Sequence, residues 1–291
     1  MIKELPTDFE FDKAQLIGSF ANGSPEWNEL RKGAVGGSQV GAILGVNPWE
    51  SAVTAYYKNI GAIEDSIEPS MSMRLGTKLE SPILEIFAEE HHDWQVFTTG
   101  TYASTVNPRF HANPDALYVD SDGSMGVVEV KFSRDYWTEV PKHYRAQVLW
   151  YCHVLGLKKG ILVALAGSTY QEFVIEFDQF ELDALVQQVQ LFLARVDAKK
   201  QPEWDGSEST FKTIRALNPD IDETEVCDLG DLGVHLSNAK DDFNAAEAKY
   251  REMQSRTLDA MGNAKYGEVD GLRLVYRSQR NGGTPFLVWK K

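Results

Sequence analysis

One stretch limits the possible folds of this chain more than any other: it runs from Asn113 to Phe132 and reads NPDALYVDSDGSMGVVEVKF. Its second half is an apolar run typical of a buried strand, yet it carries Glu129 and Lys131. Residues two apart in a strand share a face, so both charged side chains point the same way. Burying them costs on the order of several kcal/mol unless a partner offsets their charge. A divalent cation with a phosphate is one such partner.

Hydrophobic periodicity predicts helices and strands on both sides of this stretch. The expected helices cover about 25–32, 38–44, 51–61, 69–91, 141–157 and 180–199. The expected strands cover about 95–101, 116–119, 126–132, 160–166 and 171–177. This order predicts an α/β fold in which helices flank a small mixed sheet.

The last third of the chain looks separate. Residues 203–232 hold nine acidic residues and only two basic ones, Lys212 and Arg215, and read as an acidic linker. A helix is expected over about 234–261, followed by a hairpin around Asp270-Gly271 and a last strand at 286–289. We therefore expect a catalytic domain at 1–202, a linker at 203–232 and a helix-and-hairpin appendage at 233–291.

Composition narrows the class of protein. Hydrophobic residues make up 43% of the chain, but no run approaches the ~20 apolar residues of a membrane span. The N-terminus is too charged for a signal peptide, and two distant cysteines fit a reducing compartment, so a cytoplasmic location is predicted. The net charge of -14 argues against a protein that coats nucleic acid, although a local basic channel can still bind DNA.

Asp115 follows Pro114 and lies 14 residues before Glu129. If the two strands are neighbours, both carboxylates converge on one point, where they offer the hard oxygen ligands that Mg²⁺ prefers. Lys131 would then position the attacking water or bind phosphate. The alternative is an exposed face with a cross-strand ion pair. The apolar neighbours of Glu129 disfavour that alternative, because an exposed strand would alternate.

Three other segments offer companions for these residues. Glu80 lies on a predicted helix and could face the sheet, while Gln147 and Tyr151 share one face of the helix after the ExK strand. Arg31 precedes a Gly-Gly-Ser loop whose backbone N–H groups suit a phosphate. Taken singly, each is more simply an ordinary helix or surface residue.

The motifs occur in the order WxxLRxGxxxxSxV, GxxxExxxxxxF, PDA, VEVK and AQVxWY, and together they resemble the YqaJ-type viral recombinase family. This family includes the lambda-type phage exonuclease and belongs to the PD-(D/E)XK nuclease superfamily. The similarity covers about residues 24–180. It implies a PD-(D/E)XK, restriction-endonuclease-like core, with the C-terminal helix and hairpin as an appendage.

The resemblance also implies an activity and its partners. The implied enzyme depends on Mg²⁺, for which Mn²⁺ substitutes, and resects the 5′ strand of linear double-stranded DNA to leave a 3′ overhang. Its expected partners are DNA with a 5′-phosphate end, a single-strand annealing protein, and further copies of the chain in a ring such as a trimer. A phage or prophage origin in a bacterial host cytoplasm is implied, with no membrane partner.

By position, the resemblance also assigns the site residues. The metal ligands would be Glu80, Asp115, Glu129 and the carbonyl of Val130, and Lys131 would be the catalytic lysine. The 5′-phosphate pocket would include Arg31, Ser38 and Asn113, while Tyr144 and Gln147 would order the active site. Asn113 replaces a serine of the family pattern and Ala116 replaces a glycine, which puts one phosphate contact in doubt.

Two other functions are alternatives to a 5′-strand exonuclease. A PD-(D/E)XK nuclease of other polarity or substrate is one rival, but many of those hold an iron–sulfur cluster with four cysteines, and this chain has two. The other is a catalytically silent scaffold that binds DNA ends.

Trp49 and Trp137, in predicted loops, are candidates to stack on DNA ends. The C-terminal appendage could join subunits, dock a partner or cover the DNA entrance.

Overall fold

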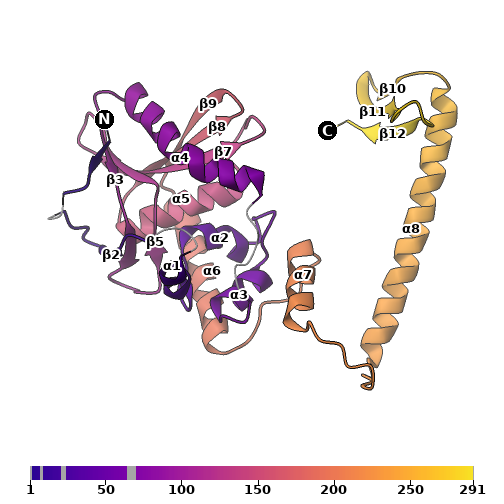
Figure 1. Cartoon of the computed structure of the whole chain (residues 1–291), viewed down its shortest axis with the longest axis horizontal. Helices are drawn as coiled ribbons and strands as arrows, with labels where there is room; N and C mark the ends of the chain where they lie inside the picture. The colour runs from indigo at the N-terminus through magenta and orange to yellow at the C-terminus, as the bar shows by residue number, and fades with distance from the viewer. Residues whose placement is uncertain (1, 7–8, 21–23, 64–69, 291) are drawn as a thin grey trace. The chain divides into compact units, whose positions relative to one another are not determined.

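The computed structural model describes residues 2–6, 9–20, 24–63 and 70–290, and it divides the chain into two units, Met1–Ile221 and Asp222–Lys291 (Figure 1). The first unit extends beyond the expected boundary at residue 202. Helix α7 (Glu208–Leu217) lies inside the segment expected to be a linker and packs on α3 (Ala52–Asn59). Ser207 caps α7 by accepting from the backbone N–H of Thr210 at 3.1 Å. The sequence did not predict this helix, because the many acidic residues around it indicated a linker.

A mixed sheet forms the centre of the first unit, as expected for an α/β fold. In the described residues its strand order is β1 (Ile2–Glu4), β3 (Gln95–Thr98), β6 (Ala116–Val119), β7 (Met125–Ser133), β8 (Lys159–Ala166) and β9 (Thr169–Glu176). The β1–β3 and β7–β8 pairs are parallel and the other pairs are antiparallel. Strand β1 was not predicted, because it is three residues long and mostly charged.

Two helices cover opposite faces of this sheet. Alternate residues of β7 enter different cores: Val127 packs in the cluster of α5 (Lys142–Leu155), and Val128 in the cluster of α4 (Met71–Glu90). Trp150 of α5 is fully buried, and α6 (Gln179–Asp197) completes that core. The expected start of the α4 helix at residue 69 lies outside the described residues.

A smaller sheet pairs β2 (Ala14–Gly18), β4 (Thr101–Ser104) and β5 (His111–Ala112). The segment between α1 (Pro25–Arg31) and α2 (Gly37–Ile43) joins it through a parallel bridge from Val35 to Phe110. The single strand expected over 95–101 was wrong, because β3 ends at Thr98 and β4 begins in the other sheet. Gly100 lies at this change of sheet, and a Cβ there would come within 2.7 Å of the Gly18 carbonyl oxygen.

The second unit consists of α8 (Asp231–Met261) and the strands β10 (Tyr266–Val269), β11 (Leu272–Ser278) and β12 (Phe286–Trp289). The predicted turn at Asp270-Gly271 is confirmed, since both residues have positive φ, 51° and 79°. Trp289 Nε1 donates to the hydroxyl of Tyr250 at 2.8 Å and ties β12 to the helix. Within the described ranges of both units, no helix is long and apolar enough to cross a membrane.

Candidate active site

The pleat of the sheet brings the charged residues of the opening stretch under α5. Glu129 and Lys131 alternate with Val128 and Val130 along β7, so they occupy the face opposite α4. Glu129 is only 2% exposed, and Lys131 Nζ donates to its Oε1 at 2.5 Å. The acid and the lysine, which the sequence placed on one face of a buried strand, therefore form a close ion pair.

Asp115 lies where β6 begins, at the point where the β6–β7 ladder ends. The last ladder pair is Ala116 with Val128, and the next backbone N–H on β7, that of Val130, donates to Asp115 Oδ2 at 2.7 Å. The carboxylate thus satisfies an N–H group that β6 no longer reaches. This contact fixes Asp115 beside Glu129 and Lys131.

Helix α5 adds a second layer to the cluster. Gln147 Nε2 donates to Glu129 Oε1 at 2.5 Å and to the hydroxyl of Tyr151 at 2.9 Å. The other oxygen of Glu129, Oε2, is buried and has no hydrogen-bond partner among the described residues. Tyr151 was not assigned to the site from sequence, although its i,i+4 spacing from Gln147 had placed both on one helix face.

The cluster holds more acidic side chains than basic ones, and this imbalance shifts their pKa values. Burial, followed by the charge of Asp115, raises the pKa of Glu129 to about 8, although Lys131 opposes the shift. Burial also raises the pKa of Asp115, again against the effect of Lys131. For Lys131, burial alone would lower the pKa, but Glu129 and Asp115 outweigh it and raise the pKa. One lysine does not balance these acids.

Glu80, on α4, interacts with the same cluster through its charge. Its side chain is partly buried, and burial followed by the charge of Asp115 raises its pKa to about 7. Lys131 acts on Glu80 in the opposite direction. Glu80 is therefore near enough to sense both Asp115 and Lys131, although it comes from a separate helix.

The donor atoms of these residues are of the kind that a divalent cation takes. They supply carboxylate oxygens, which Mg²⁺ prefers, and one of them, Glu129 Oε2, is buried without a partner. Within the described part of the chain, no three acidic, histidine or cysteine side chains stand as a completed ligand cage. The carboxylates, of which Glu129 now bonds Lys131, would therefore have to close around the ion.

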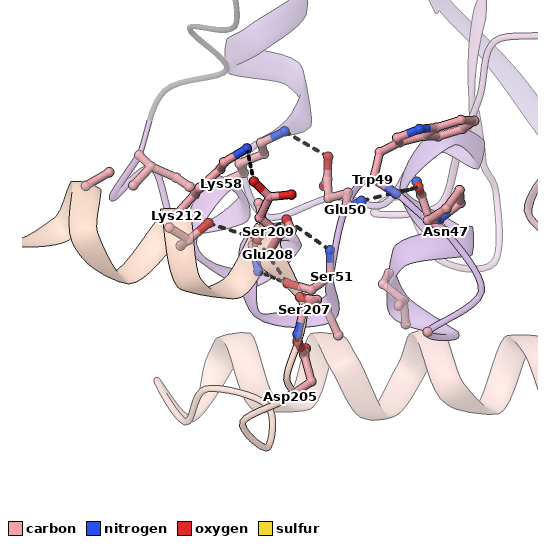
Figure 2. Close-up of a pocket in the computed structure, with 18 of the residues that line it drawn as sticks. Asn47, Trp49, Glu50, Ser51, Lys58, Asp205, Ser207, Glu208, Ser209 and Lys212 are labelled. Atoms are coloured by element: carbon pink, nitrogen blue, oxygen red, sulfur yellow. Dashed lines mark hydrogen bonds and ion pairs between the residues drawn. The ribbon is translucent and has the colours of Figure 1, made fainter. Parts of the chain in front are cut away.

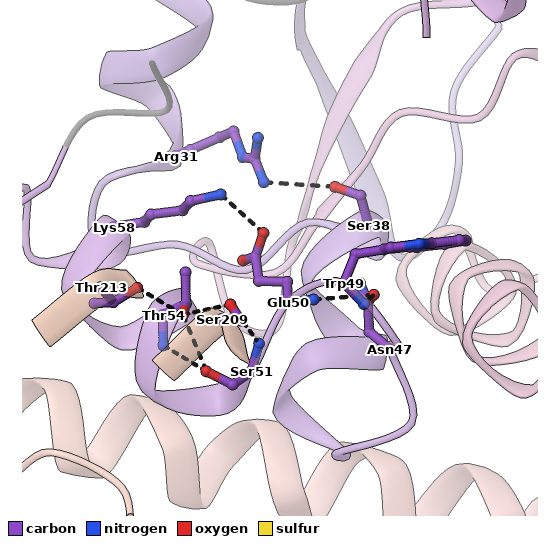
Figure 3. Close-up of polar contacts among 10 residues, drawn as sticks. All are labelled: Arg31, Ser38, Asn47, Trp49, Glu50, Ser51, Thr54, Lys58, Ser209 and Thr213. Atoms are coloured by element: carbon purple, nitrogen blue, oxygen red, sulfur yellow. Dashed lines mark hydrogen bonds and ion pairs between the residues drawn. The ribbon is translucent and has the colours of Figure 1, made fainter. Parts of the chain in front are cut away.

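The residues expected to bind phosphate lie on neighbouring elements. Arg31 Nη2 donates to Ser38 Oγ at 3.5 Å, as Figure 3 shows, and the Arg31 guanidinium stacks 4.1 Å from the Trp27 ring centroid. Gly37 lets α2 approach α5 closely, because a Cβ there would meet the Tyr151 ring at 2.4 Å. This contact joins the Arg31 region to the Gln147–Glu129 network.

Of the other residues predicted to contact the substrate, Tyr144 lies beside the cluster, whereas Asn113 and the Gly36 N–H already have hydrogen-bond partners in the protein. Tyr144 lies beside the cluster, with Lys131 Nζ 5.1 Å from its ring centroid. Asn113 Oδ1 accepts from Thr101 Oγ1 at 3.1 Å, so its side chain also has a role in joining β4 to the loop before Asp115. The Gly36 N–H, one of the loop groups expected to suit a phosphate, already donates to Gln39 Oε1 at 3.0 Å.

The two tryptophans proposed to stack on DNA ends have different surroundings. Trp49 is 68% exposed, and its ring meets the His143 ring edge-on at 5.0 Å. Trp137 instead packs against Tyr144 and Phe173. Of the two, Trp49 is the one with an open ring face.

Trp49 also lines a hollow of about 990 Å³ between the α2–α3 loop, α3 and α7 (Figure 2). On one side of it, a set of hydroxyl groups holds α7 on α3 (Figure 3). Thr54 Oγ1 lies 2.7 Å from Ser209 Oγ and 2.8 Å from Thr213 Oγ1, and Ser51 N donates to Ser209 Oγ at 3.3 Å. Thr54 and Thr213 are buried, so these hydrogen bonds satisfy groups that water does not reach.

Residues 26–158, which run from α1 to just beyond α5, match the model of the YqaJ-like viral recombinase domain. This segment is similar to the YqaJ-like viral recombinase domain. The segment contains Arg31, Glu80, Asp115, Glu129 and Lys131. The resemblance to this family, expected from the ordered motifs, is thereby confirmed.

Relatives of the YqaJ-like domain agree with the fold. YqaJ of Bacillus subtilis (strain 168), an uncharacterized protein, is 22% identical over 269 residues, which cover 87% of this chain and 82% of YqaJ. The crystal structure of LHK-Exo, an alkaline exonuclease from Laribacter hongkongensis, in complex with dAMP is 20% identical, with a TM-score of 0.51. The match covers 68% of this chain and 100% of that one. The expected PD-(D/E)XK-type fold is confirmed.

Proposed function

We propose that this protein is a Mg²⁺-dependent exonuclease that digests the 5′ strand of linear double-stranded DNA and leaves a 3′ overhang. The observation that carries the proposal is the acid–lysine cluster under α5. There, a fully buried glutamate shares one oxygen with Lys131 and Gln147 and leaves the other without a partner. A merely structural ion pair would satisfy both oxygens, because an unsatisfied buried charge is costly.

Glu80, Asp115 and Glu129 would hold the cation through their carboxylates, with the carbonyl of Val130 as a further ligand. When bound, the ion lowers the pKa of a coordinated water and offsets the charge of the phosphate undergoing attack. Lys131, kept protonated by its acidic neighbours, would orient that water or bind a phosphate oxygen. Gln147 would hold Glu129 in place, and Tyr151 would hold Gln147.

The preference for the 5′ strand would come from the region around Arg31. The Arg31 guanidinium and the Ser38 hydroxyl are adjacent donors that can bind a terminal phosphate. They connect to the cluster through the close packing of Gly37 on Tyr151. A 5′-phosphate held there would place the first phosphodiester of that strand toward Glu129.

The wider setting of the proposal rests on the family. Viral recombinases of this kind would work in a bacterial host cytoplasm beside a single-strand annealing protein, which would take up the 3′ overhang. A ring of subunits, such as a trimer, would keep the enzyme on its DNA. With a net charge of -14, DNA binding would depend on local basic residues and would weaken steeply with salt.

The test is release of acid-soluble nucleotide from linear duplex DNA with Mg²⁺ or Mn²⁺. We expect release by the natural protein, and none above background by Asp115→Ala or Lys131→Ala variants whose melting temperatures show that they fold. Circular duplex should resist digestion. Retained digestion of linear duplex by folded Asp115→Ala would contradict the site. DNA binding without any release by the natural protein would favour a silent scaffold.

The phosphate pocket is tested separately with Arg31→Ala. This variant should digest 5′-phosphorylated ends more slowly while losing little on dephosphorylated ends. Lys32→Ala is the matched control, because Lys32 is an exposed neighbour that pairs only with Glu29 in the described contacts. Equal ratios for the two ends in all three proteins would exclude this role for Arg31.

A further inference from the structure

Helix α8 carries a regular apolar repeat that its own unit does not cover. Apolar residues recur at alternating intervals of four and three, which is the heptad spacing of a coiled coil. They are Leu232, Leu236, Ala239, Phe243, Ala246, Tyr250 and Met253. We call this row the α8 seam.

The α8 seam is exposed along its length. No residue of α8 is buried, and Leu236 and Phe243 are 64% and 59% exposed. The hairpin packs near the end of the helix, where Trp289 bonds Tyr250 and Gly267 meets Met261. A single helix of 31 residues with such a row lacks a partner, because heptad side chains are stabilised by packing between helices.

We propose that the α8 seam binds the α8 seam of a second copy in an antiparallel two-helix coiled coil. In one register, each large side chain faces a small one: Phe243 faces Ala246 of the second copy, and Tyr250 faces Ala239. Leu236 faces Met253, two side chains of similar size. The layers then differ less in volume than they would if Phe243 or Tyr250 faced its own copy, which favours close packing.

Charges beside the seam favour the same register. In an antiparallel pair, Asp242 faces Lys249 of the second copy, and Lys240 faces Glu247. By symmetry each pair occurs twice. In the single chain Lys249 and Glu247 make only exposed contacts along their own helix, with Glu252 and Arg251, and such pairs are weak. They can therefore exchange partners at little cost.

Other arrangements of the same helix are poorer. A parallel pair in register would stack Phe243 on Phe243 and Ala239 on Ala239, alternating crowded and empty layers, and would bring Asp242 beside Glu247. Moving the antiparallel pair by one heptad would place Asp242 opposite its own copy in one direction, or Lys249 opposite its own copy in the other. Packing and charge thus select one arrangement.

The first test is sedimentation of the full chain over a range of concentrations. We expect the natural protein and an Ala248→Glu control to associate identically, because Ala248 lies on the helix face away from the seam. Phe243→Glu should abolish that association step without loss of helix content. A natural protein that stays monomeric at the highest concentration, or a Phe243→Glu variant that associates like the natural protein, would overturn the proposal.

Charge reversal tests the register. Asp242→Lys or Lys249→Asp alone should weaken association, because each creates two like-charge contacts across the seam. The double variant Asp242→Lys, Lys249→Asp should restore it. A double variant as weak as the singles would overturn the pairing of Asp242 with Lys249.

Disulfide trapping tests the direction of the helices. In a Cys227→Ser background, which removes the exposed cysteine, a mixture of Leu236→Cys and Met253→Cys chains should form a heterodimer on oxidation. Leu236→Cys chains alone should not crosslink to one another. Efficient self-crosslinking of Leu236→Cys would indicate a parallel pair and overturn the antiparallel model, as would failure of the mixture to crosslink.

Discussion

Helices α5 and α8 show how differently one chain uses amphipathic helices. Nine of the 14 residues of α5 are buried, whereas none of the 31 residues of α8 is. The covered face of α5 places Gln147 against a buried acid, whereas the α8 seam is exposed and its one described hydrogen bond to another element is that of Tyr250 with Trp289. An apolar repeat predicts that one face of a helix will be covered, but the surrounding fold determines what covers it.

The largest contrast should appear in catalysis. Glu129→Gln keeps the shape of a buried side chain but removes its charge, so we expect the rate of DNA digestion to fall by about 100- to 1,000-fold, the size typical of losing one electrostatic group at an active site. Glu247→Gln makes the same chemical change on α8 and should leave the initial rate unchanged. Nucleotide release from linear duplex measures both. A loss below about tenfold for Glu129→Gln would place it outside the site.

Truncating an apolar side chain should also affect the two helices very differently, in this case through the free energy of unfolding. Leu149→Ala in α5 removes a 1% exposed side chain and should lower the free energy of unfolding by about 2–5 kcal/mol. Leu236→Ala in α8 removes a 64% exposed side chain and should change it by less than about 0.5 kcal/mol in dilute protein. Denaturant unfolding measures both values. Equal losses would show that the α8 seam is already covered within one chain.

A smaller effect is expected where α7 meets α3. Thr54→Val removes a buried hydroxyl that lies between Ser209 and Thr213 and leaves their hydroxyls with fewer partners, which should cost about 1–3 kcal/mol. Thr257→Val on α8 is the matched control, because its hydroxyl bonds only the Met253 carbonyl one turn earlier in the described contacts. Thermal unfolding compares the two. A harmless Thr54→Val would mean that α7 is not held by these hydroxyls.

The smallest predicted effect is a pH-dependent response to Mg²⁺. The pKa values of Glu80 and Glu129 are raised from 4.5 to about 7 and about 8. In metal-free protein their contribution to stability is full below the ordinary pKa of 4.5, and it is lost as pH rises through about 7 and 8. Mg²⁺ binds the ionised carboxylates, so its stabilising effect should grow across the same window.

Melting temperatures with and without Mg²⁺, at about pH 6 and about pH 9, test this response. The increase caused by Mg²⁺ should be larger at the higher pH, and Glu129→Gln should reduce it there. An equal increase at both values would separate Mg²⁺ binding from the titration of these acids.

The sequence predicted the parts of the fold that local patterns encode. The apolar run around Glu129 located β7, and Asp270-Gly271 located the hairpin of the second unit. Five elements were missed: β1, β2, β4, β5 and α7. The strands are short. β1 and β2 pair with segments far along the chain, and the β4–β5 ladder holds only two residue pairs, so little in the local sequence marks them. Helix α7 has a capping serine, Ser207, but lies among many charged residues.

The sequence named residues that the fold brings together, but it did not give their contacts, and their roles stay predictions. Spacing placed Glu129 and Lys131 on one face, and the i,i+4 rule placed Gln147 beside Tyr151. The hydrogen bond from the Val130 N–H to Asp115 depends on where β6 ends, which no local pattern states. The orphaned oxygen of Glu129 likewise follows from tertiary packing.

The measurement that tests the central claim most directly is a time course on linear duplex DNA labelled at the 5′ or the 3′ end, digested by the natural protein with Mg²⁺. We predict early release of the 5′ label as mononucleotide, while the 3′ label stays in long single strands. Early release of the 3′ label, internal cutting that releases both labels in long fragments, or no release with Mg²⁺ or Mn²⁺ would contradict the account.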